Sequence, residues 1–345
     1  MGSESSEMTS GPSGSLSWFF EQNFGSRVFV PRLPGNHGDE LMRIALDLLL
    51  RRYGMTRINT ARGADWILIR GNGAMNDFWR NGLDALAYYS KTFPHVPLAV
   101  LPASYDFAQT NLNGILQHRT SRCVLFAREK GSFERLKSLK LPQSVELHID
   151  HDTALLLQDE PLIDKFRRIR IRRTNSSEGY ILIVERRDCE HVDLPQMVLG
   201  ESKLPMSAHP LGIRLAKAIG RHPRRIWCQF RWQHINGILS ERVSERLECE
   251  VSMGLRDIYP QYSTLTWRCG DVSDPLKYSF QQFCSLISKA EVVATTRLHV
   301  AIFSAMLGVP TLIRTGNTDK IGGVWDLSLR LYHNVKLLTT EGSPS

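Results

Sequence analysis

The sequence has 345 residues, of which 42% are hydrophobic and 23% are charged. A chain of this length and composition can form two ordinary globular domains. The balance of hydrophobic to charged residues excludes a wholly disordered protein. The formal net charge of +8 favours an anionic partner, which could be a nucleic acid, a membrane surface or an acidic small molecule.

Residues 1–26 are expected to form a disordered tail. The opening stretch MGSESSEMTSGPSGS is rich in serine and glycine and lacks the basic and apolar regions of a secretory signal, so we expect a cytoplasmic protein. The most apolar stretch, Val300 to Ile313, is interrupted by Gly308 and Pro310 and is too short for a membrane span. The six cysteines are scattered, which predicts neither a disulfide framework nor a metal site.

Residues 27–163 are predicted to form a Rossmann-like domain. Short β-rich runs alternate there with amphipathic helical runs, as is typical of βα units around a mainly parallel sheet. A helix is expected from Glu40 to Arg52 because apolar residues recur on one helical face. Strands are expected at Arg27 to Pro31, Trp66 to Ile69, Pro97 to Leu101, Cys123 to Ala127 and Val145 to Ile149.

Residues 164–179 are predicted to form a linker, and residues 180–345 a second Rossmann-like domain. The linker contains the basic run Lys165 to Arg173 followed by turn-forming residues. An exposed basic run of this kind is compatible with peripheral contact at an anionic membrane. Strands are expected at Tyr180 to Val184, Arg225 to Phe230, Glu291 to Thr295 and Pro310 to Arg314, and helices at Leu211 to Gly220, Tyr278 to Lys289 and Leu298 to Leu307.

Two glycine-rich loops follow strands of the first predicted domain. Ligands of open α/β sheets bind beyond the carboxyl ends of the strands, so these loops are candidate sites. In GNHGDE, Asp39 could cap the following helix, and a turn with a helix cap would explain the loop without a ligand. The second loop, GNGAMNDFW, is neither a dinucleotide-binding motif nor a P-loop, although its backbone amides could hold an anion.

The loop TTRLH carries the strongest chemical signal. It follows an apolar strand and opens a helix that Thr295 or Thr296 could cap, so helix amides, Arg297 and His299 could converge on an anion such as phosphate. In the alternative interpretation, Arg297 pairs with a carboxylate and His299 is an ordinary helix residue. Arg186 follows the first strand of the second half, where it could bind an anion or lie exposed to solvent.

Eight stretches, taken in order, resemble the polysaccharide pyruvyltransferase family. They extend from about Pro34 to Trp325 and therefore cover most of the chain. Three positions differ from the family pattern: Asn72 and Asp319 stand where glycine is usual, and Val300 replaces the glycine after the histidine. The stretches are GNHGDE, GNGAMNDFW, LPASYDF, LFAREKGSFERL, HDTALLL, ERRDCE, TTRLHVAIFSAMLGVPTLI and GNTDKIGGVWD.

This resemblance implies a GT-B-like arrangement of two Rossmann-like domains with an interdomain cleft. It implies phosphoenolpyruvate as the donor, on the C-terminal side, and a sugar hydroxyl pair of a polysaccharide or lipid-linked glycan as the acceptor, on the N-terminal side. His299 is implied as the catalytic residue and Arg186 and Arg297 as donor-binding residues. No metal or further cofactor is expected. Other residues of the matching stretches assigned to substrate binding are Leu298, Asp39, Asp77, Asn317 and Lys320.

Two alternatives belong to other functional classes. A GT-B glycosyltransferase using a nucleotide sugar would share the fold, but this analogy concerns the fold alone. A non-enzymatic binder of nucleic acid or anionic membrane would use the basic run Lys165 to Arg173. The run contains one aromatic residue, Phe166, but no nucleic-acid motif, so we expect no nucleic-acid partner.

Overall fold

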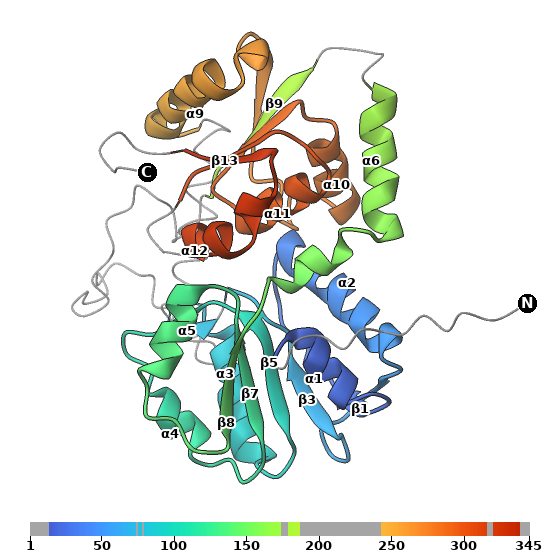
Figure 1. The fold of residues 1–345 in the computed structure, drawn as a ribbon, viewed down its shortest axis with the longest axis vertical. Coiled ribbons are helices and arrows are strands. Elements are labelled where there is room, and N and C mark those ends of the chain that lie inside the picture. The colour runs from blue at the N-terminus through green and yellow to red at the C-terminus, as the bar shows by residue number, and fades with distance from the viewer. Residues whose placement is uncertain are drawn as a thin grey trace, which may run out of the picture.

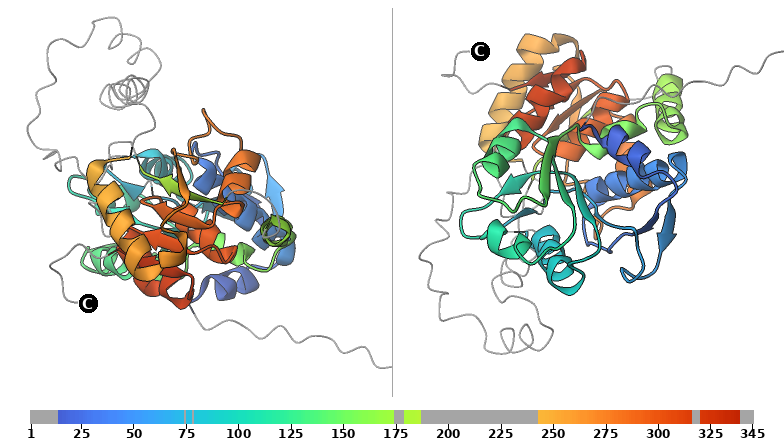
Figure 2. Two further views of the ribbon diagram at one scale, coloured as in Figure 1. Left: turned by 90° about the horizontal axis from the view of Figure 1, so that it is seen from above. Right: turned by 60° about the horizontal axis from the view of Figure 1, so that its bottom comes forward.

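The computed structural model describes residues 14–173, 179–186, 243–315 and 320–338, apart from positions 74 and 78. Two parallel β-sheets form the centres of two lobes, one from the N-terminal half of the chain and one from the C-terminal half (Figure 1). Helices pack on both faces of each sheet, and two further views show the same layering (Figure 2). The predicted α/β class with two doubly wound halves is therefore confirmed.

The N-terminal sheet has six parallel strands in the order β2-β1-β3-β5-β7-β8. Its inner strands β3, β5 and β7 are buried at every position, as a sheet covered on both faces requires. The strands predicted at Trp66–Ile69, Cys123–Ala127 and Val145–Ile149 have the observed bounds. The elements of this lobe are α1 (Leu16–Gln22), β1 (Arg27–Phe29), α2 (His37–Arg52), β2 (Thr56–Ile58), β3 (Trp66–Ile69), β4 (Met75–Asn76), α3 (Asn81–Thr92), β5 (Leu98–Ala103), β6 (Tyr105–Asp106), α4 (Leu112–Leu116), β7 (Cys123–Ala127), α5 (Lys130–Lys137), β8 (Val145–Ile149) and the 3-10 helix η1 (Thr153–Leu157).

The C-terminal sheet has five parallel strands in the order β10-β9-β11-β12-β13. Strand β9 has the predicted bounds, whereas β10 and β13 were not predicted. The strand predicted at Arg225 to Phe230 and the helix predicted at Leu211 to Gly220 lie outside the described residues. The elements are α6 (Pro161–Arg173), β9 (Tyr180–Val184), α9 (Glu245–Ile258), η2 (Pro260–Tyr262), β10 (Thr266–Cys269), α10 (Phe280–Ser288), β11 (Val292–Thr295), α11 (Leu298–Met306), β12 (Thr311–Ile313), α12 (Lys320–Leu327), η3 (Leu329–Leu331) and β13 (Val335–Leu337).

The prediction of a disordered tail over residues 1–26 is wrong for its described part. Residues 16–22 form α1, whose first turn is capped because the Ser15 hydroxyl accepts a hydrogen bond from the Trp18 amide. Phe19 is buried against the edge of Trp66, with ring centroids 4.9 Å apart. The serine- and glycine-rich opening obscured this short apolar run, which becomes ordered because the sheet offers it a surface on which to pack.

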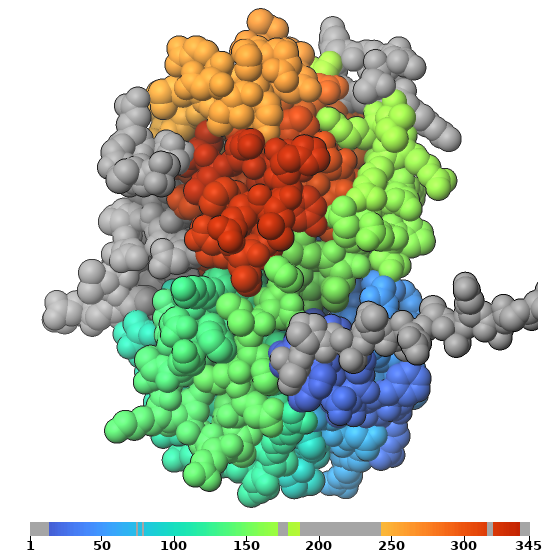
Figure 3. Space-filling model, in the orientation of Figure 1, coloured from blue at the N-terminus to red at the C-terminus, as the bar shows by residue number. Residues whose placement is uncertain are grey.

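The predicted linker contains most of α6. This helix packs against the C-terminal lobe through buried Ile163 and Phe166 (Figure 3). Arg167 Nε donates to the Met306 carbonyl at 3.0 Å, and Arg170 also donates to a backbone carbonyl of that lobe. Part of the basic run therefore holds α6 against the C-terminal lobe, which corrects the expectation of a run exposed to solvent. Among the described residues, no helix is both long and apolar enough to cross a bilayer.

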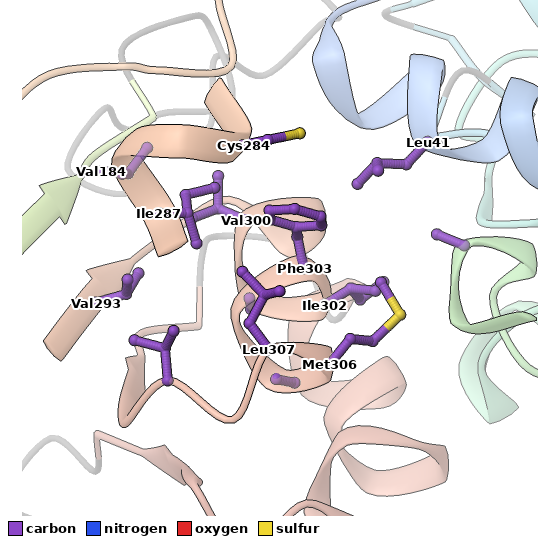
Figure 4. Packing of buried hydrophobic residues seen from close by; sticks show 14 of the residues in the cluster. Leu41, Val184, Cys284, Ile287, Val293, Val300, Ile302, Phe303, Met306 and Leu307 are labelled. Carbon is purple, nitrogen blue, oxygen red and sulfur yellow. The ribbon is translucent and has the colours of Figure 1, made fainter. Parts of the chain in front are cut away.

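One apolar core spans both lobes. Leu41 of α2 and Leu157 of η1 belong to the same buried cluster as Phe303 and Met306 of α11. Figure 4 shows Leu41 facing the helix that carries Phe303 and Met306. Because these side chains are almost completely removed from water, their burial stabilises the docking of α11 on the N-terminal lobe. The loop between β11 and α11 is thereby held against residues of the other lobe.

Candidate functional site

Strand ends from both sheets meet at one junction between the lobes. β11 ends at Thr295, and α11 begins with Leu298 and His299. In the other lobe β8 ends at Ile149, and Asp152 follows immediately before η1. His299 Nε2 lies 3.4 Å from Asp152 Oδ2, which is long for a hydrogen bond but close enough for strong attraction if the imidazole is protonated.

Asp152 is a completely buried carboxylate at this junction, with 0% of its side chain exposed. Arg128 Nη1 donates to its Oδ2 at 2.7 Å, and the Ala154 amide donates to its Oδ1 at 2.9 Å. Burial opposes ionisation, but the charges of His299 and Arg128 and the Ala154 amide outweigh it and hold the pKa of Asp152 well below its usual range. Asp152 therefore remains ionised and faces His299.

His299 also lies against the first turn of α2. A Cβ atom at Gly38 would clash with the ring and Cβ of His299, so this close approach requires glycine. The Asn36 side chain accepts hydrogen bonds from the Gly38 and Asp39 amides, and Asp39 accepts one from the Asn36 amide. This capping box makes Asn36 the N-cap instead of the predicted Asp39, and α2 begins three residues earlier than expected.

The two acidic residues predicted to bind substrate both hold loops of the N-terminal lobe. Asp39 is an acceptor in the capping box, and its Oδ1 lies 3.9 Å from Arg70 Nη2. The Asp77 carboxylate accepts hydrogen bonds from two amides and a hydroxyl of residues 108–110. Burial would raise the pKa of Asp77, but these donors outweigh it and lower that pKa.

Arg297 forms a two-pronged ion pair with Asp271. Its Nε donates to Asp271 Oδ1 at 3.2 Å, and its Nη2 donates to Oδ2. The side chains of Arg297 and Asp271 are only 11% and 12% exposed, so the contact is well shielded from solvent. This geometry agrees with the alternative interpretation of the sequence, in which Arg297 pairs with a carboxylate. An anion bound at Arg297 would share the guanidinium with Asp271.

The threonines of the TTRLH loop connect neighbouring strand ends instead of capping α11. Thr295 Oγ1 accepts a hydrogen bond from the Arg297 amide and donates one to the Val184 carbonyl, both at 2.9 Å. Thr296 Oγ1 accepts a hydrogen bond from the Arg186 amide at 2.7 Å. Since β9 and β11 are adjacent parallel strands, Arg186 and Arg297 leave the sheet at the same edge, as predicted.

Lys320 brings α12 to the glycine-rich loop of the other lobe. Its Nζ donates to the Gly73 carbonyl at 3.3 Å. A Cβ atom at Gly73 would lie 3.4 Å from Lys320 Nζ and 3.5 Å from Arg128 Nη2, so two cations from opposite lobes flank this glycine. Glu129 is buried nearby and accepts hydrogen bonds from two serine hydroxyls. Burial raises the pKa of Glu129 despite the opposing charges of Arg128 and Lys320.

Leu298 and Val300 belong to the packing around α11. Leu298 is partly buried and packs against the interlobe core, while Val300 is buried within it (Figure 4). The core therefore accommodates the valine that replaces the glycine of the family pattern. Asn317 lies outside the described residues.

Three residues of this junction, Arg128, Asp152 and Asp271, were not predicted from the sequence. The first two lie in LFAREKGSFERL and HDTALLL, which the resemblance includes without assigning either residue a role. A signal was nevertheless present, because both follow predicted strands at the sheet edge where ligands of α/β proteins bind. Asp271 follows β10, a four-residue edge strand without a buried position, so its short sequence TWRC lacks the apolar run that signals a covered strand.

A cleft of about 570 Å³ opens between α5 of the N-terminal lobe and α12 of the C-terminal lobe. One of its lining residues, Gly323, lies against Glu129, since a Cβ atom there would be 2.8 Å from Glu129 Cβ. The cleft lies between the two lobes, but none of the residues predicted to bind substrate lines it. Among the described residues, no three His, Cys, Asp or Glu side chains gather to hold a metal ion. The cleft is lined by Lys130, Gly131, Gly322, Gly323, Asp326, Leu327 and Arg330.

Two solved structures align with this chain at low sequence identity. A functionally uncharacterized protein from Klebsiella pneumoniae aligns with a TM-score of 0.53 and 18% identity, covering 93% of this chain and 95% of its own. A UDP-GlcNAc 2-epimerase from Methanocaldococcus jannaschii aligns with a TM-score of 0.38 and 10% identity, covering 90% of this chain and 88% of its own. The first likeness shows the fold alone. No curated protein matches the chain.

A family model identifies the region that contains the Arg297 and His299 loop. Residues 218–315 match the model described as polysaccharide pyruvyl transferase. Within the described residues, this region contains β11 and α11, which bring His299 to the lobe junction, and Asp271, which pairs with Arg297. Over residues 218–315, which include the TTRLH stretch, the resemblance to the polysaccharide pyruvyltransferase family is thus confirmed.

Proposed function

We propose that this chain transfers the pyruvyl group of phosphoenolpyruvate to two neighbouring hydroxyls of a glycan, forming a pyruvate ketal. The observation that supports this proposal most directly is the position of His299. It lies in the family-matched region and meets a buried carboxylate of the other lobe at a sheet-edge junction. Such edges are where α/β proteins bind ligands.

The proposed reaction requires proton transfer but no oxidant or reductant. The methylene carbon of the donor accepts a proton while one acceptor hydroxyl adds to the adjacent carbon. Departure of phosphate then lets the second hydroxyl close the ring, so one diol and one phosphoenolpyruvate give one ketal and one phosphate. Histidine is suited to one of these proton transfers, worth roughly 10²- to 10⁴-fold in rate, and we assign it to His299.

Donor binding is assigned to cations at the same edge. Phosphoenolpyruvate carries a carboxylate and a phosphate, and both suit the fixed donors of a guanidinium group. We propose that Arg186 and Arg297 bind the donor with Lys320 as a third cation. Leu298 and Asn317 are proposed to line this site, whereas the loop contacts of Asp39 and Asp77 favour a shaping role. The acceptor, free, polymeric or lipid-linked, would approach from the N-terminal lobe.

Phosphoenolpyruvate is expected to raise the melting temperature of the protein. A ligand that binds only the folded state at 100 times its dissociation constant stabilises by about 2.7 kcal/mol, which corresponds to several degrees. A thermal-shift titration with phosphoenolpyruvate, with inorganic sulfate as the control anion, measures this effect. A clear shift with a nucleotide sugar and none with millimolar phosphoenolpyruvate would contradict the proposal and support a glycosyltransferase instead.

Arg297→Ala and Arg186→Ala are each expected to weaken donor binding by about 2–5 kcal/mol, because each removes a charge-assisted contact from a shielded anion. Substitution of either arginine by lysine should preserve donor binding only in part, since lysine lacks the two-pronged donor geometry of arginine. Isothermal titration with phosphoenolpyruvate gives the affinities. The matched control is Arg256→Ala, because the Arg256 side chain is 72% exposed and the donor should bind that variant normally. Normal donor binding by both site variants would show that these arginines are not the donor ligands.

A further inference from the structure

The structure assigns Asp152 as the positioning residue for His299, an inference that rests on the proposed function. Asp152 belongs to the N-terminal lobe and His299 to the C-terminal lobe, and their side chains approach to 3.4 Å. We therefore infer that the proton-transferring histidine is oriented across the lobe junction. His299 is therefore positioned for proton transfer only when the two lobes are docked.

The Asp152 carboxylate is itself held in one position. Arg128 Nη1 donates to Asp152 Oδ2 at 2.7 Å, and Arg128 Nε donates to Ser104 Oγ at 2.8 Å. The Ala154 amide occupies the other carboxylate oxygen. Since Arg128 and Asp152 are both buried, neither can exchange these partners for water without losing the shared contact. The carboxylate therefore presents a fixed negative charge to His299.

The imidazole is confined on its opposite side as well. The ring packs against the backbone at Gly38, where any Cβ atom would clash with Nδ1. Asp152 lies near Nε2, so α2 and the β8–η1 loop of one lobe contact both ring nitrogens of a residue from the other. The buried core around α11 fixes the backbone of His299. Both the position and the rotation of the ring are thus restricted.

The charges around His299 explain what Asp152 would do. From the first turn of α2 come His37, whose Nε2 hydrogen-bonds the Tyr278 carbonyl, and Asp39 of the capping box. On its own loop Arg297 is paired with Asp271, and Arg128 stands behind Asp152. Asp152 is the carboxylate whose oxygen lies within ion-pair distance of the ring. A fixed carboxylate at this separation restricts the orientation of the imidazole ring.

Asp152→Asn tests the assignment because it keeps the shape and removes the charge. Turnover is expected to fall at least about 10-fold, and by about 10² if the ring moves by 1 Å, while the KM for phosphoenolpyruvate changes little. Asp152→Glu, which keeps the charge, should recover part of the lost turnover. Asp65→Asn is the matched control, since Asp65 makes an exposed ion pair with Arg27 in the same lobe and should change neither quantity.

NMR of the His299 ring, identified by the signal lost in His299→Ala, reports the position of the ring without turnover. Unchanged chemical shifts of the His299 ring in Asp152→Asn overturn the inference, even if turnover falls. If Asp152→Asn does not fold, the double variant Arg128→Met with Asp152→Asn removes both buried charges and should show the same change in chemical shift. Absence of pyruvyl transfer by the wild-type protein would refute the proposed function, while the chemical shifts would still decide whether Asp152 positions His299.

Discussion

His299→Ala is expected to lower turnover by at least about 10²-fold while the protein keeps its fold. This is the lower end of the rate effect of a positioned general acid or base. Arg128 and the Ala154 amide still neutralise Asp152 in the variant, so the junction does not gain an unpaired buried charge. Steady-state kinetics with phosphoenolpyruvate and a diol acceptor measure turnover, and isothermal titration measures donor affinity.

The separation of rate from binding is what identifies a proton-transfer role. Donor affinity should fall much less than turnover, and one ionisation in the wild-type pH profile should be missing from the variant. His333→Ala is the matched control, because His333 is an exposed histidine of the same lobe. If affinity and turnover fall together, His299 mainly holds the donor, and near-normal turnover would reduce it to a structural residue of α11.

Arg128→Met is expected to lower the free energy of unfolding at pH 7 by about 3–5 kcal/mol, the usual cost of removing one partner from a buried ion pair. The substitution keeps much of the apolar volume but leaves the carboxylate of Asp152 without its guanidinium partner. Urea denaturation, followed by fluorescence and circular dichroism, gives the change in midpoint. The matched control is Arg122→Met, whose partially exposed pair with Glu146 should cost about 0–1 kcal/mol.

The cost of Arg128→Met should depend on pH. In the wild-type protein the pKa of Asp152 is lowered, so its stabilising effect is present above the unfolded value of about 3.9 and is lost as the pH falls through the folded value. Without Arg128 the pKa of Asp152 rises, because burial is less strongly opposed. The stability difference between variant and wild type should therefore be constant near neutral pH and shrink as the pH falls below the pKa that Asp152 has in the variant. A difference independent of pH would mean that the cost comes from packing and not from the Asp152 charge.

Much of the fold follows from local sequence pattern. The runs that became β3, β7, β8 and β9 have the predicted bounds. β3, β7 and β9 are apolar throughout, as strands of a sheet covered on both faces must be. β8, at the edge of its sheet, alternates apolar with polar residues, which is the other pattern that signals a strand. Similarly, the predicted stop signals Gly308 and Pro310 lie just beyond the observed end of α11, the helix that contains His299.

Two predictions failed where the structure of a segment depends on a partner that is distant in the sequence. Residues 16–22 form an apolar run that is too short to signal a helix by its periodicity, yet Phe19 and Phe20 are buried because β3 and β7 offer aromatic and aliphatic partners. The arginine-rich α6 resembles a solvated linker, but its apolar face and two of its arginines contact the C-terminal lobe. Composition describes a segment by itself and does not reveal the surface against which it packs.

The sequence by itself determined the α/β class, the loops at the strand ends and the ordered motifs that carry His299, Arg186 and Arg297. Only the tertiary structure decided that Asp152 faces His299 and that Asp271 pairs with Arg297. A strand or helix pattern depends on neighbouring residues, so it can be read along the chain. The contact between Asp152 and His299 depends instead on the packing of α2 and η1 against α11, because this buried interlobe core brings together two loops that are remote in sequence.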